Sequence, residues 1–355
     1  MAQNKNARIL YIDLARGLTM LTILWGHVML TGSVNLVVYA FHIPVFFFLS
    51  GMVFRKDKYP TLGSLVKRRV ETLLIPYVFY SGITWIWWLI DCVSKGYSLT
   101  GSWKPLFQTF IAQGSAGYML HNPALLFVTC LFVVEIIYFF ICKLPVWMNV
   151  LTGLLLAAIG YGMMQPNGFF DFKALPWNIE VAFTAVIFYA LGNLFSDYTD
   201  HKKLVQSAKE NPVVIWVLTA VFFTILCVGG VKNGHATMAQ GVLGDNVLIF
   251  YLVAVCGIIF MICLCVALSS VFGCIKGVDT VLDYFAWMGR NSFYMMVLHI
   301  PVMLVAVRIV SIVSEVSLDA VRVEYVYTIP AWIGMVVGSS ILTALIVKIK
   351  KRMQL

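Results

Sequence analysis

The segment DLARGLTMLTILWGH, residues 13–27, lies inside an apolar run over residues 9–54. It carries three ionisable side chains, Asp13, Arg16 and His27. Arg16 and His27 are eleven positions apart, about three helical turns plus roughly 20°, so both side chains leave the same face of a helix. Asp13, three residues before Arg16, shares that face. Ionisable groups are costly in a bilayer and usually face a protein interior or a wet cavity. We therefore interpret this face as the edge of a functional site.

The composition is that of a polytopic membrane protein. Of the 355 residues, 61% are hydrophobic and only 12% are charged, and the mean hydropathy is +0.90. Nearly every apolar run approaches or exceeds the roughly 17 to 20 residues that a helix needs to cross the hydrocarbon core. The short alternating segments of a membrane β-barrel are missing. The sequence thus predicts an all-α bundle embedded in the lipid bilayer.

The hydropathy pattern predicts about ten transmembrane helices in one membrane domain over residues 1–355, with no appended soluble domain. We place the spans at about 10–31, 36–54, 72–93, 123–142, 148–164, 176–196, 211–230, 247–270, 289–311 and 327–348. Because no small-residue cleavage site follows the first span, we expect it to be retained.

The net charge of +9 reflects topology rather than nucleic-acid binding. The basic residues lie in short loops between spans and do not gather on one soluble face. With the N-terminus in the cytoplasm, 19 of the 25 Lys and Arg residues fall on the inner side and six on the outer side. The positive-inside rule then predicts that both termini are cytoplasmic.

The eight cysteines fall mostly within or at the ends of apolar runs. They form no CxxC pair and no Cys/His spacing typical of a metal site. We expect buried free thiols and no bound metal.

Helix depth predicts which polar side chains meet in the outer half of the membrane. His27 lies roughly 16 Å beyond Arg16 along the first span. His42, near the outer start of the second span, and Glu180, near the outer start of the sixth, enter at a similar depth. We therefore predict a chamber formed by His27, His42 and Glu180.

The inner end of the first span is expected to be cationic. Arg16 lies there together with the run Lys67, Arg68 and Arg69 and with Arg290. A tunnel with such a mouth suits a long anionic donor whose phosphates bind guanidinium forks, and coenzyme A thioesters have that shape.

A neutral histidine at the deep end of such a tunnel can act as a general base. His27 would take the proton from an acceptor hydroxyl, with Glu180 or Asp13 orienting the imidazole or offsetting its charge. The sequence alone leaves open which acid does so.

Each of these residues also has a structural interpretation. Asp13 and Arg16 can form an ion pair at the helix end, and the run at 67–69 can act as a topology determinant or a lipid-headgroup patch. His299 can be a core histidine bonded to a neighbouring helix. His42 can satisfy backbone carbonyls freed by the proline that follows it.

A transporter or flippase of a small polar or glycan substrate is the alternative function, because intramembrane ionisable residues are equally expected there. Its marks would be inverted repeats and Gly/Pro-interrupted spans in corresponding halves. The sequence shows neither, so an enzyme is the preferred interpretation.

Several segments resemble the acyltransferase-3 family of integral membrane acyltransferases. LYIDLARG (10–17), His27 and FHIPVFFFLSGMVF (41–54) follow the family's order, and the spacing from Arg16 to His27 fits its signature. Further similar segments are KRR (67–69) before LIPY (74–77), LPWNIE (175–180) before FYALGN (188–193), and MGRNS (288–292) before Leu298 and His299. The resemblance covers essentially the whole chain, and LPWN and FYALG look most like the fucose 4-O-acetylase-like branch.

The resemblance implies a ten-helix enzyme of the bacterial inner membrane. Such enzymes use acyl-CoA, usually acetyl-CoA from the cytoplasm, to O-acylate a carbohydrate, and need no permanently bound cofactor. The expected partners are therefore acyl-CoA, a glycan acceptor and the lipid bilayer, with a homodimer left open. By position, Arg16 and His27 match the family's essential arginine and histidine, and Arg68 or Arg69 matches its basic loop.

From the residues and the resemblance together we expect three groups of site residues. The catalytic group is His27, Asp13 and Glu180. The donor-binding group is Arg16, Lys67, Arg68, Arg69 and Arg290. The acceptor-binding group is His42, Ser50, Trp177, Asn178, Asn291, Ser292 and His299. One segment departs from the family, because residues 123–128, PALLFV, lack the tryptophan expected at the start of the fourth span. If that tryptophan contacts the acceptor, the acceptor here is unusual.

Overall fold

The computed structural model describes residues 9–114, 119–165, 175–274 and 276–353, and most of these residues are helical. The longer helices are α1 (Leu10–Val28), α2 (Ser33–Met52), α4 (Ile75–Ser94), α6 (Leu126–Ile141), α7 (Val146–Met164), α8 (Ile179–Tyr198), α10 (Pro212–Lys232), α11 (Val247–Ser270), α12 (Lys276–Arg290), α13 (Ser292–Ser314) and α15 (Tyr325–Met353). The shorter α-helices are α3 (Leu62–Arg69), α5 (Trp103–Ile111), α9 (His201–Glu210) and α14 (Leu318–Val323). Single 3₁₀ turns occur at η1 (Lys56–Lys58), η3 (Pro123–Leu125), η4 (Pro176–Asn178) and η5 (Met238–Gln240), and η2 (Val70–Leu74) is a π-helical turn.

The strands found in the described part of the chain are β1 (Ala236–Thr237) and β2 (Val242–Leu243). They pair antiparallel, with Ala236 opposite Leu243. This small hairpin joins α10 to α11 and contacts α2.

Nine helical segments within the described ranges are long and apolar enough to cross a membrane. They are α2, Leu62–Ser94, Pro123–Ile141, α7, Pro176–Tyr198, α10, α11, α13 and α15. The prediction of a helical integral membrane protein is confirmed at this level. The predicted first span, α1, is not among the nine, because Asp13, Arg16 and His27 lower its hydropathy. A tenth span and cytoplasmic termini stay predictions, and residues 1–8, which carry part of the charge asymmetry, lie outside the described residues.

The third predicted span begins earlier than expected. We predicted a span over 72–93 with the basic run before it, but one helix runs from Leu62 to Ser94 and includes that run. The π-helical turn Val70–Leu74 joins its two parts, and the Ile75 N–H bonds back to the Val70 carbonyl. Pro76 follows at once, and because proline has no N–H to donate, the local widening lets the helix continue across it.

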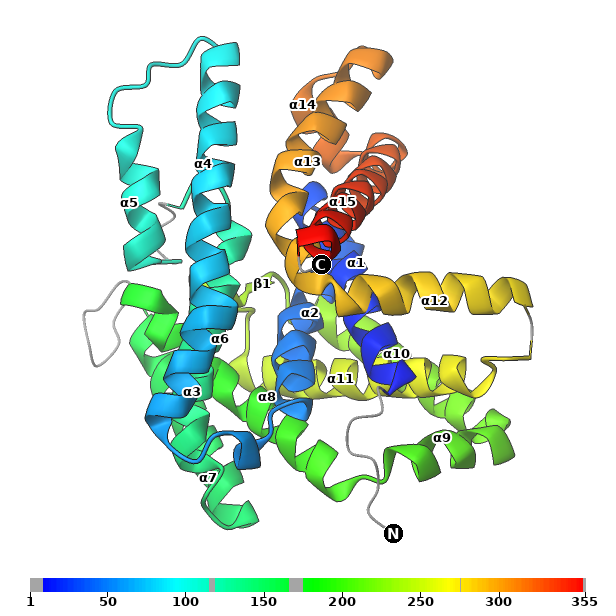
Figure 1. The fold of residues 1–355 in the computed structure, drawn as a ribbon. Helices are drawn as coiled ribbons and strands as arrows, with labels where there is room; N and C mark the ends of the chain where they lie inside the picture. Colours follow the sequence, from blue (N-terminus) through cyan, green and yellow to red (C-terminus); the bar gives the residue numbers. More distant parts are fainter. Residues whose placement is uncertain (1–8, 115–118, 166–174, 275, 354–355) are drawn as a thin grey trace.

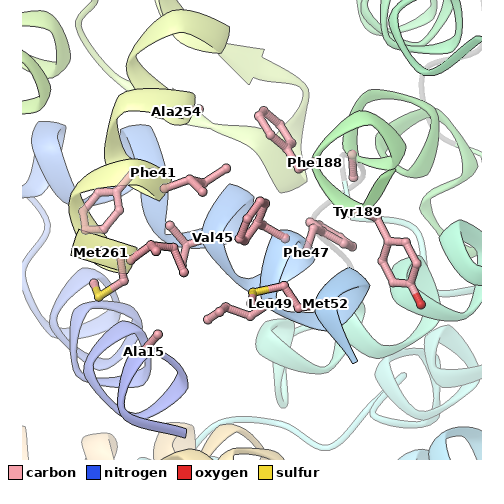
Figure 2. Packing of buried hydrophobic residues seen from close by; sticks show 14 of the residues in the cluster. Ala15, Phe41, Val45, Phe47, Leu49, Met52, Phe188, Tyr189, Ala254 and Met261 are labelled. Carbon is pink, nitrogen blue, oxygen red and sulfur yellow. The ribbon is translucent and has the colours of Figure 1, made fainter. Parts of the chain in front are cut away.

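Helix α2 lies at the centre of the larger hydrophobic core. Figure 2 shows Val45 and Phe47 of α2 between Met261 of α11 and Phe188 of α8, and all four side chains are almost completely buried. Close packing of these apolar side chains holds α2 in place between its neighbours. His42, on the same helix, is therefore set at a defined depth and orientation.

Helix α12 lies across α1 (Figure 1), and the crossing depends on two glycines. A Cβ atom on Gly17 would overlap the carbonyl group of Phe285, and one on Gly289 would overlap the carbonyl group of Asp13. Only glycine permits backbones to approach this closely. The crossing places Arg290, the next residue of α12, beside Asp13.

Candidate active site

A cavity of about 450 Å³ lies next to the last turn of α1. Its walls come from the last turn of α1, from the middle of α2, from the loop after α5, from the starts of α6 and α8, from the β1 hairpin and from α14. The residues that line it are Gly26, His27, Leu30, Tyr39, His42, Ile43, Phe47, Gly114, Met119, Leu120, Pro123, Ala124, Leu126, Phe127, Cys130, Asn178, Val181, Thr237, Met238, Ala239, Gln240 and Arg322. The volume falls in the usual range for small-molecule sites.

His27 enters this cavity from the last turn of α1 and has a second histidine beside it. The ring of His299, from α13, lies with its centroid 4.8 Å from that of His27, at an interplanar angle of 51°. His299 is completely buried. The side chain that contacts His27 is thus an imidazole, where the sequence led us to expect a carboxylate.

His42 also lines the cavity, as predicted from its depth. Its Nδ1 atom lies 2.6 Å from the carbonyl oxygen of Val38, and the ring of Tyr39 packs edge-on against it at 5.0 Å. If Nδ1 carries the proton and donates it to this carbonyl, Nε2 is left as an acceptor. Such a ring can receive a hydrogen bond from a substrate hydroxyl.

Glu180, the third predicted member of the chamber, is placed differently. It is buried at the start of α8, and its Oε2 atom accepts a hydrogen bond from the backbone N–H of Leu175 at 3.3 Å. Among the described residues that line the cavity, neither Glu180 nor any other carboxylate appears. Its neighbours Asn178 and Val181 do line it, so the predicted depth is right for the segment.

Asn178 shapes the cavity through its backbone as well as its side chain. Trp177 and Asn178 both have positive φ angles, 61° and 55°, a backbone conformation that is uncommon for residues other than glycine. Asn178 Oδ1 accepts a hydrogen bond from the Gly114 N–H at 2.6 Å. The Trp177 indole N–H donates to the carbonyl oxygen of Phe110 at 2.8 Å. The LPWN segment therefore fastens the end of α5 and the residues after it to the cavity wall.

Arg322 is a cavity residue that sequence reasoning missed. From α14, its Nη2 donates to the carbonyl oxygen of His27 at 2.9 Å and its Nε to that of Val28 at 3.3 Å. In return, the Leu30 N–H donates to the Arg322 carbonyl oxygen at 2.9 Å. Burial lowers the pKa of Arg322, but arginine stays protonated at neutral pH. In the sequence Arg322 is only one of the six Lys and Arg residues predicted to lie on the outer side, and no local pattern distinguishes it from the others.

The N-terminal end of α1 forms a separate polar site. Asp13 pairs with Arg290 at 3.6 Å, and Arg16 Nη2 donates to the carbonyl oxygen of Leu49 at 3.4 Å. Because α1 is unbroken from Leu10 to Val28, Asp13 lies about 21 Å along the axis from His27. Asp13 therefore cannot touch the imidazole, and the expectation that it orients His27 directly is corrected. A role for Asp13 at the donor end stays a prediction.

The basic run at 67–69 divides into two kinds of side chain. Lys67 and Arg68 are exposed. Arg69 instead forms an ion pair with the buried Glu135 of α6, and its guanidinium lies over the ring of Tyr59 at 5.5 Å. The Tyr189 hydroxyl donates to Glu135 Oε1 at 3.2 Å. Arg69 and Tyr189 thus explain how the carboxylate of Glu135 is accommodated in α6. Lys67 and Arg68 are the exposed cations of the run.

The other predicted substrate residues lie outside the cavity lining within the described ranges. The Ser50 hydroxyl donates to the carbonyl oxygen of Phe46 in its own helix at 2.8 Å, and Asn291 Nδ2 donates to that of Trp287 at 2.8 Å. Ser292 begins α13. No group of three His, Cys, Asp or Glu side chains able to hold a metal ion occurs among the described residues.

Comparison with known families gives one match. The family model described as "Acyltransferase domain" matches residues 9–348, nearly the whole chain. No curated protein and no solved structure matches the chain in the corresponding comparisons. The match includes α1 with Arg16 and His27, the basic run of α3 and the cavity walls. The chain therefore belongs to the acyltransferase-3 family of membrane acyltransferases.

Proposed function

We propose that the protein transfers an acetyl or similar short acyl group from acyl-CoA to a hydroxyl group of a carbohydrate, with His27 as the general base. The observation that carries the proposal is the position of His27 in the wall of a cavity large enough for a sugar residue. In the reaction the acceptor oxygen forms a bond to the thioester carbonyl carbon. The proton goes to His27, the C–S bond breaks to release coenzyme A thiolate, and the thiolate takes this proton from His27, which returns to its neutral form.

The two ends of α1 support a division of labour between donor and acceptor. Arg16 and Arg290 lie at the N-terminal end of α1. Lys67 and Arg68 are exposed on α3. His27 lies about 16 Å from Arg16, at the other end of α1. Cationic side chains suit the phosphates of coenzyme A, and the extended arm of the donor would bring the thioester towards His27. The path of the donor between these two ends is part of the proposal.

His299 takes the place beside His27 that we had expected an acid to hold. A neutral imidazole cannot offset the charge of a protonated His27 as a carboxylate would, but it can accept a hydrogen bond or relay a proton. We assign His299 as the residue that positions His27, and Glu180 as a structural residue that anchors the segment before α8.

The proposed setting is the inner membrane of a bacterium, with both termini in the cytoplasm and a glycan outside it as the acceptor. Within the family we propose the fucose 4-O-acetylase-like branch, because the LPWN and FYALG segments resemble it. Mass spectrometry of surface glycans from cells with and without the gene should show the loss of an acetyl group, which identifies the acceptor.

Thiol release from acetyl-CoA by purified protein in detergent tests the reaction itself. A transferase releases thiol in the presence of a glycan extract without any membrane gradient, whereas a flippase or transporter does not. His27→Ala should abolish the release. His201, at the start of α9, bonds to Tyr11 at the opposite end of α1. His201→Ala is therefore the control and should retain most of the release. Undiminished thiol release by the His27 variant would refute the assignment of the base.

A further inference from the structure

Arg322 carries the only full charge among the described residues that line the cavity. The other polar groups of the lining are the neutral side chains of Tyr39, Asn178, Thr237 and Gln240 and the histidines His27 and His42. Binding a neutral sugar requires hydrogen-bonding groups and no fixed charge. A lone cation in such a wall is therefore unexplained by a neutral acceptor.

The hydrogen bonds of Arg322 leave part of its guanidinium free. Of its five N–H groups, one at Nη2 binds the carbonyl oxygen of His27 and the one at Nε binds that of Val28. Within the described part of the chain, the remaining three N–H groups make no hydrogen bond or ion pair. Asp319, one helical turn earlier, attracts Arg322 at longer range, but it is exposed and makes no ion pair with it.

The two carbonyl groups that Arg322 binds are uncharged, so its positive charge is not neutralised by them. A guanidinium fork with free N–H groups matches a carboxylate or a phosphate, and charge-assisted hydrogen bonds of this kind are about twice as strong as neutral ones. Because the same guanidinium is 2.9 Å from the His27 carbonyl oxygen, an anion bound there shares the cavity with the imidazole of His27.

We propose that Arg322 binds a carboxylate or phosphate group of the acceptor, so that the enzyme selects an acidic carbohydrate and presents one of its hydroxyls to His27. This inference rests on the proposed function, since it takes the ligand of the cavity to be the acceptor. The donor phosphates belong to the other end of α1, so Arg322 has no part in binding acetyl-CoA.

Calorimetric titration of the purified full-length protein, without acetyl-CoA, tests the inference independently of turnover. The probes are methyl glucuronide, methyl glucoside 6-phosphate and methyl glucoside, which differ only at the sixth carbon. We expect at least one acidic probe to bind about 10- to 100-fold more tightly than the neutral probe, the range typical for a hydrogen bond to a charged group. The tighter of the two identifies whether the anion is a carboxylate or a phosphate.

Variants at two arginines locate the effect. Arg322→Gln keeps an amide donor for the His27 carbonyl but removes the charge, and it should lose the preference for the acidic probe. Arg322→Lys keeps the charge but not the fork, and it should retain only part of the preference. Arg308→Gln removes an outer arginine that lies beside Asp91 and away from the cavity lining, and it should behave as the wild type.

Equal binding of all three probes by the wild type would overturn the inference, as would an undiminished acid preference in Arg322→Gln. Arg322 would then serve only to cap the carbonyl end of α1. Should Arg322→Gln not fold, the wild-type preference and the Arg322→Lys variant decide the question.

Acetyl transfer without any acid preference leaves the proposed function standing. Tight binding of acidic sugars without transfer refutes the proposed function but not the anion site.

Discussion

His27 is held from two sides at the end of α1. Its ring contacts His299, and its carbonyl oxygen accepts a hydrogen bond from Arg322. Cations near the carbonyl end of a helix are favourable because they offset the partial negative charge of the helix dipole there. Arg322 therefore fixes the backbone of the residue whose side chain does the proposed chemistry, whatever else it binds.

Replacing Arg69 should lower the stability of the protein much more than replacing Arg68. Arg69→Gln leaves Glu135 buried and without its ion-pair partner, which typically costs about 3 kcal/mol or more. Arg68 is exposed, so Arg68→Gln should change the free energy of unfolding by less than about 0.5 kcal/mol. Thermal unfolding in detergent measures the difference, and equal melting temperatures for the two variants would contradict the ion-pair interpretation.

Arg68, although unimportant for stability, should contribute to donor binding. Arg68→Gln is expected to raise the KM for acetyl-CoA severalfold with kcat little changed, because an exposed guanidinium is free to bind a phosphate. Steady-state kinetics at saturating acceptor give both constants. If the KM stays at the wild-type value in Arg68→Gln and in Lys67→Gln, the donor phosphates bind elsewhere.

At the scale of elements, α5 is tied to α4 by a buried polar chain. The two helices lie side by side (Figure 1). The Tyr77 hydroxyl donates to the Thr109 carbonyl oxygen at 2.7 Å, the Ser81 and Thr109 hydroxyls are 2.7 Å apart, and Ser81 Oγ lies 2.8 Å from His121 Nε2. Met119 and Leu120, just before His121, line the cavity. This polar chain therefore positions part of the cavity wall.

Acid should weaken this attachment. Burial lowers the pKa of His121 from its ordinary value of 6.5 to about 4, so between these two values the unfolded chain binds a proton that the folded chain does not. The contribution of neutral His121 to the free energy of unfolding is thus intact above about pH 6.5 and is lost as the pH falls to about 4. The loss is at most about 3 kcal/mol. Unfolding measured from pH 7 to 4 should show a smaller loss in His121→Gln than in the wild type. Parallel curves for the two proteins would exclude this role.

The crossing of α1 and α12 gives a second prediction about elements. Gly17→Ala places a methyl group where the Phe285 carbonyl lies, so the helices must separate, with a loss of about 2 kcal/mol or more and lower activity. In Gly82→Ala the added methyl group meets no neighbouring atom, and helix propensity predicts a gain of about 0.5 kcal/mol. Melting temperatures of the two variants provide the test. Similar values would show that the crossing tolerates a wider spacing.

At the scale of the whole molecule, the sequence predicted the parts that depend on local pattern. At nine of the ten predicted positions the described part of the structure has a helix long and apolar enough to span a membrane. Helix depth predicted that His27 and His42 lie close together, and both line one cavity. At α1 the ionisable residues Asp13, Arg16 and His27 dilute the apolar character, so this helix is not among the nine and its span stays a prediction. Hydropathy also missed the helical nature of the basic run, because charged residues lower the local hydropathy and the π-helical turn at Val70–Leu74 has no simple sequence signal.

The contacts that sequence reasoning missed join residues far apart in the chain. Arg69 meets Glu135, His27 meets His299, and Arg322 binds the end of α1. Each depends on how the helices cross, and crossing geometry is set by packing rather than by local pattern. Glu180 shows the same limit, because its depth was correct but its carboxylate binds the Leu175 N–H instead of lining the cavity.

The central claim is that His27 performs the chemistry and Arg16, at the other end of α1, holds the donor. The most direct test is a steady-state comparison of acetyl transfer by the wild type, His27→Ala and Arg16→Lys in one detergent preparation. His27→Ala should lower kcat by at least about 100-fold, the scale of general-base catalysis, with the KM for acetyl-CoA unchanged. Arg16→Lys keeps the charge but loses the fork, so it should raise that KM while leaving most of kcat. Full turnover by His27→Ala would contradict the account.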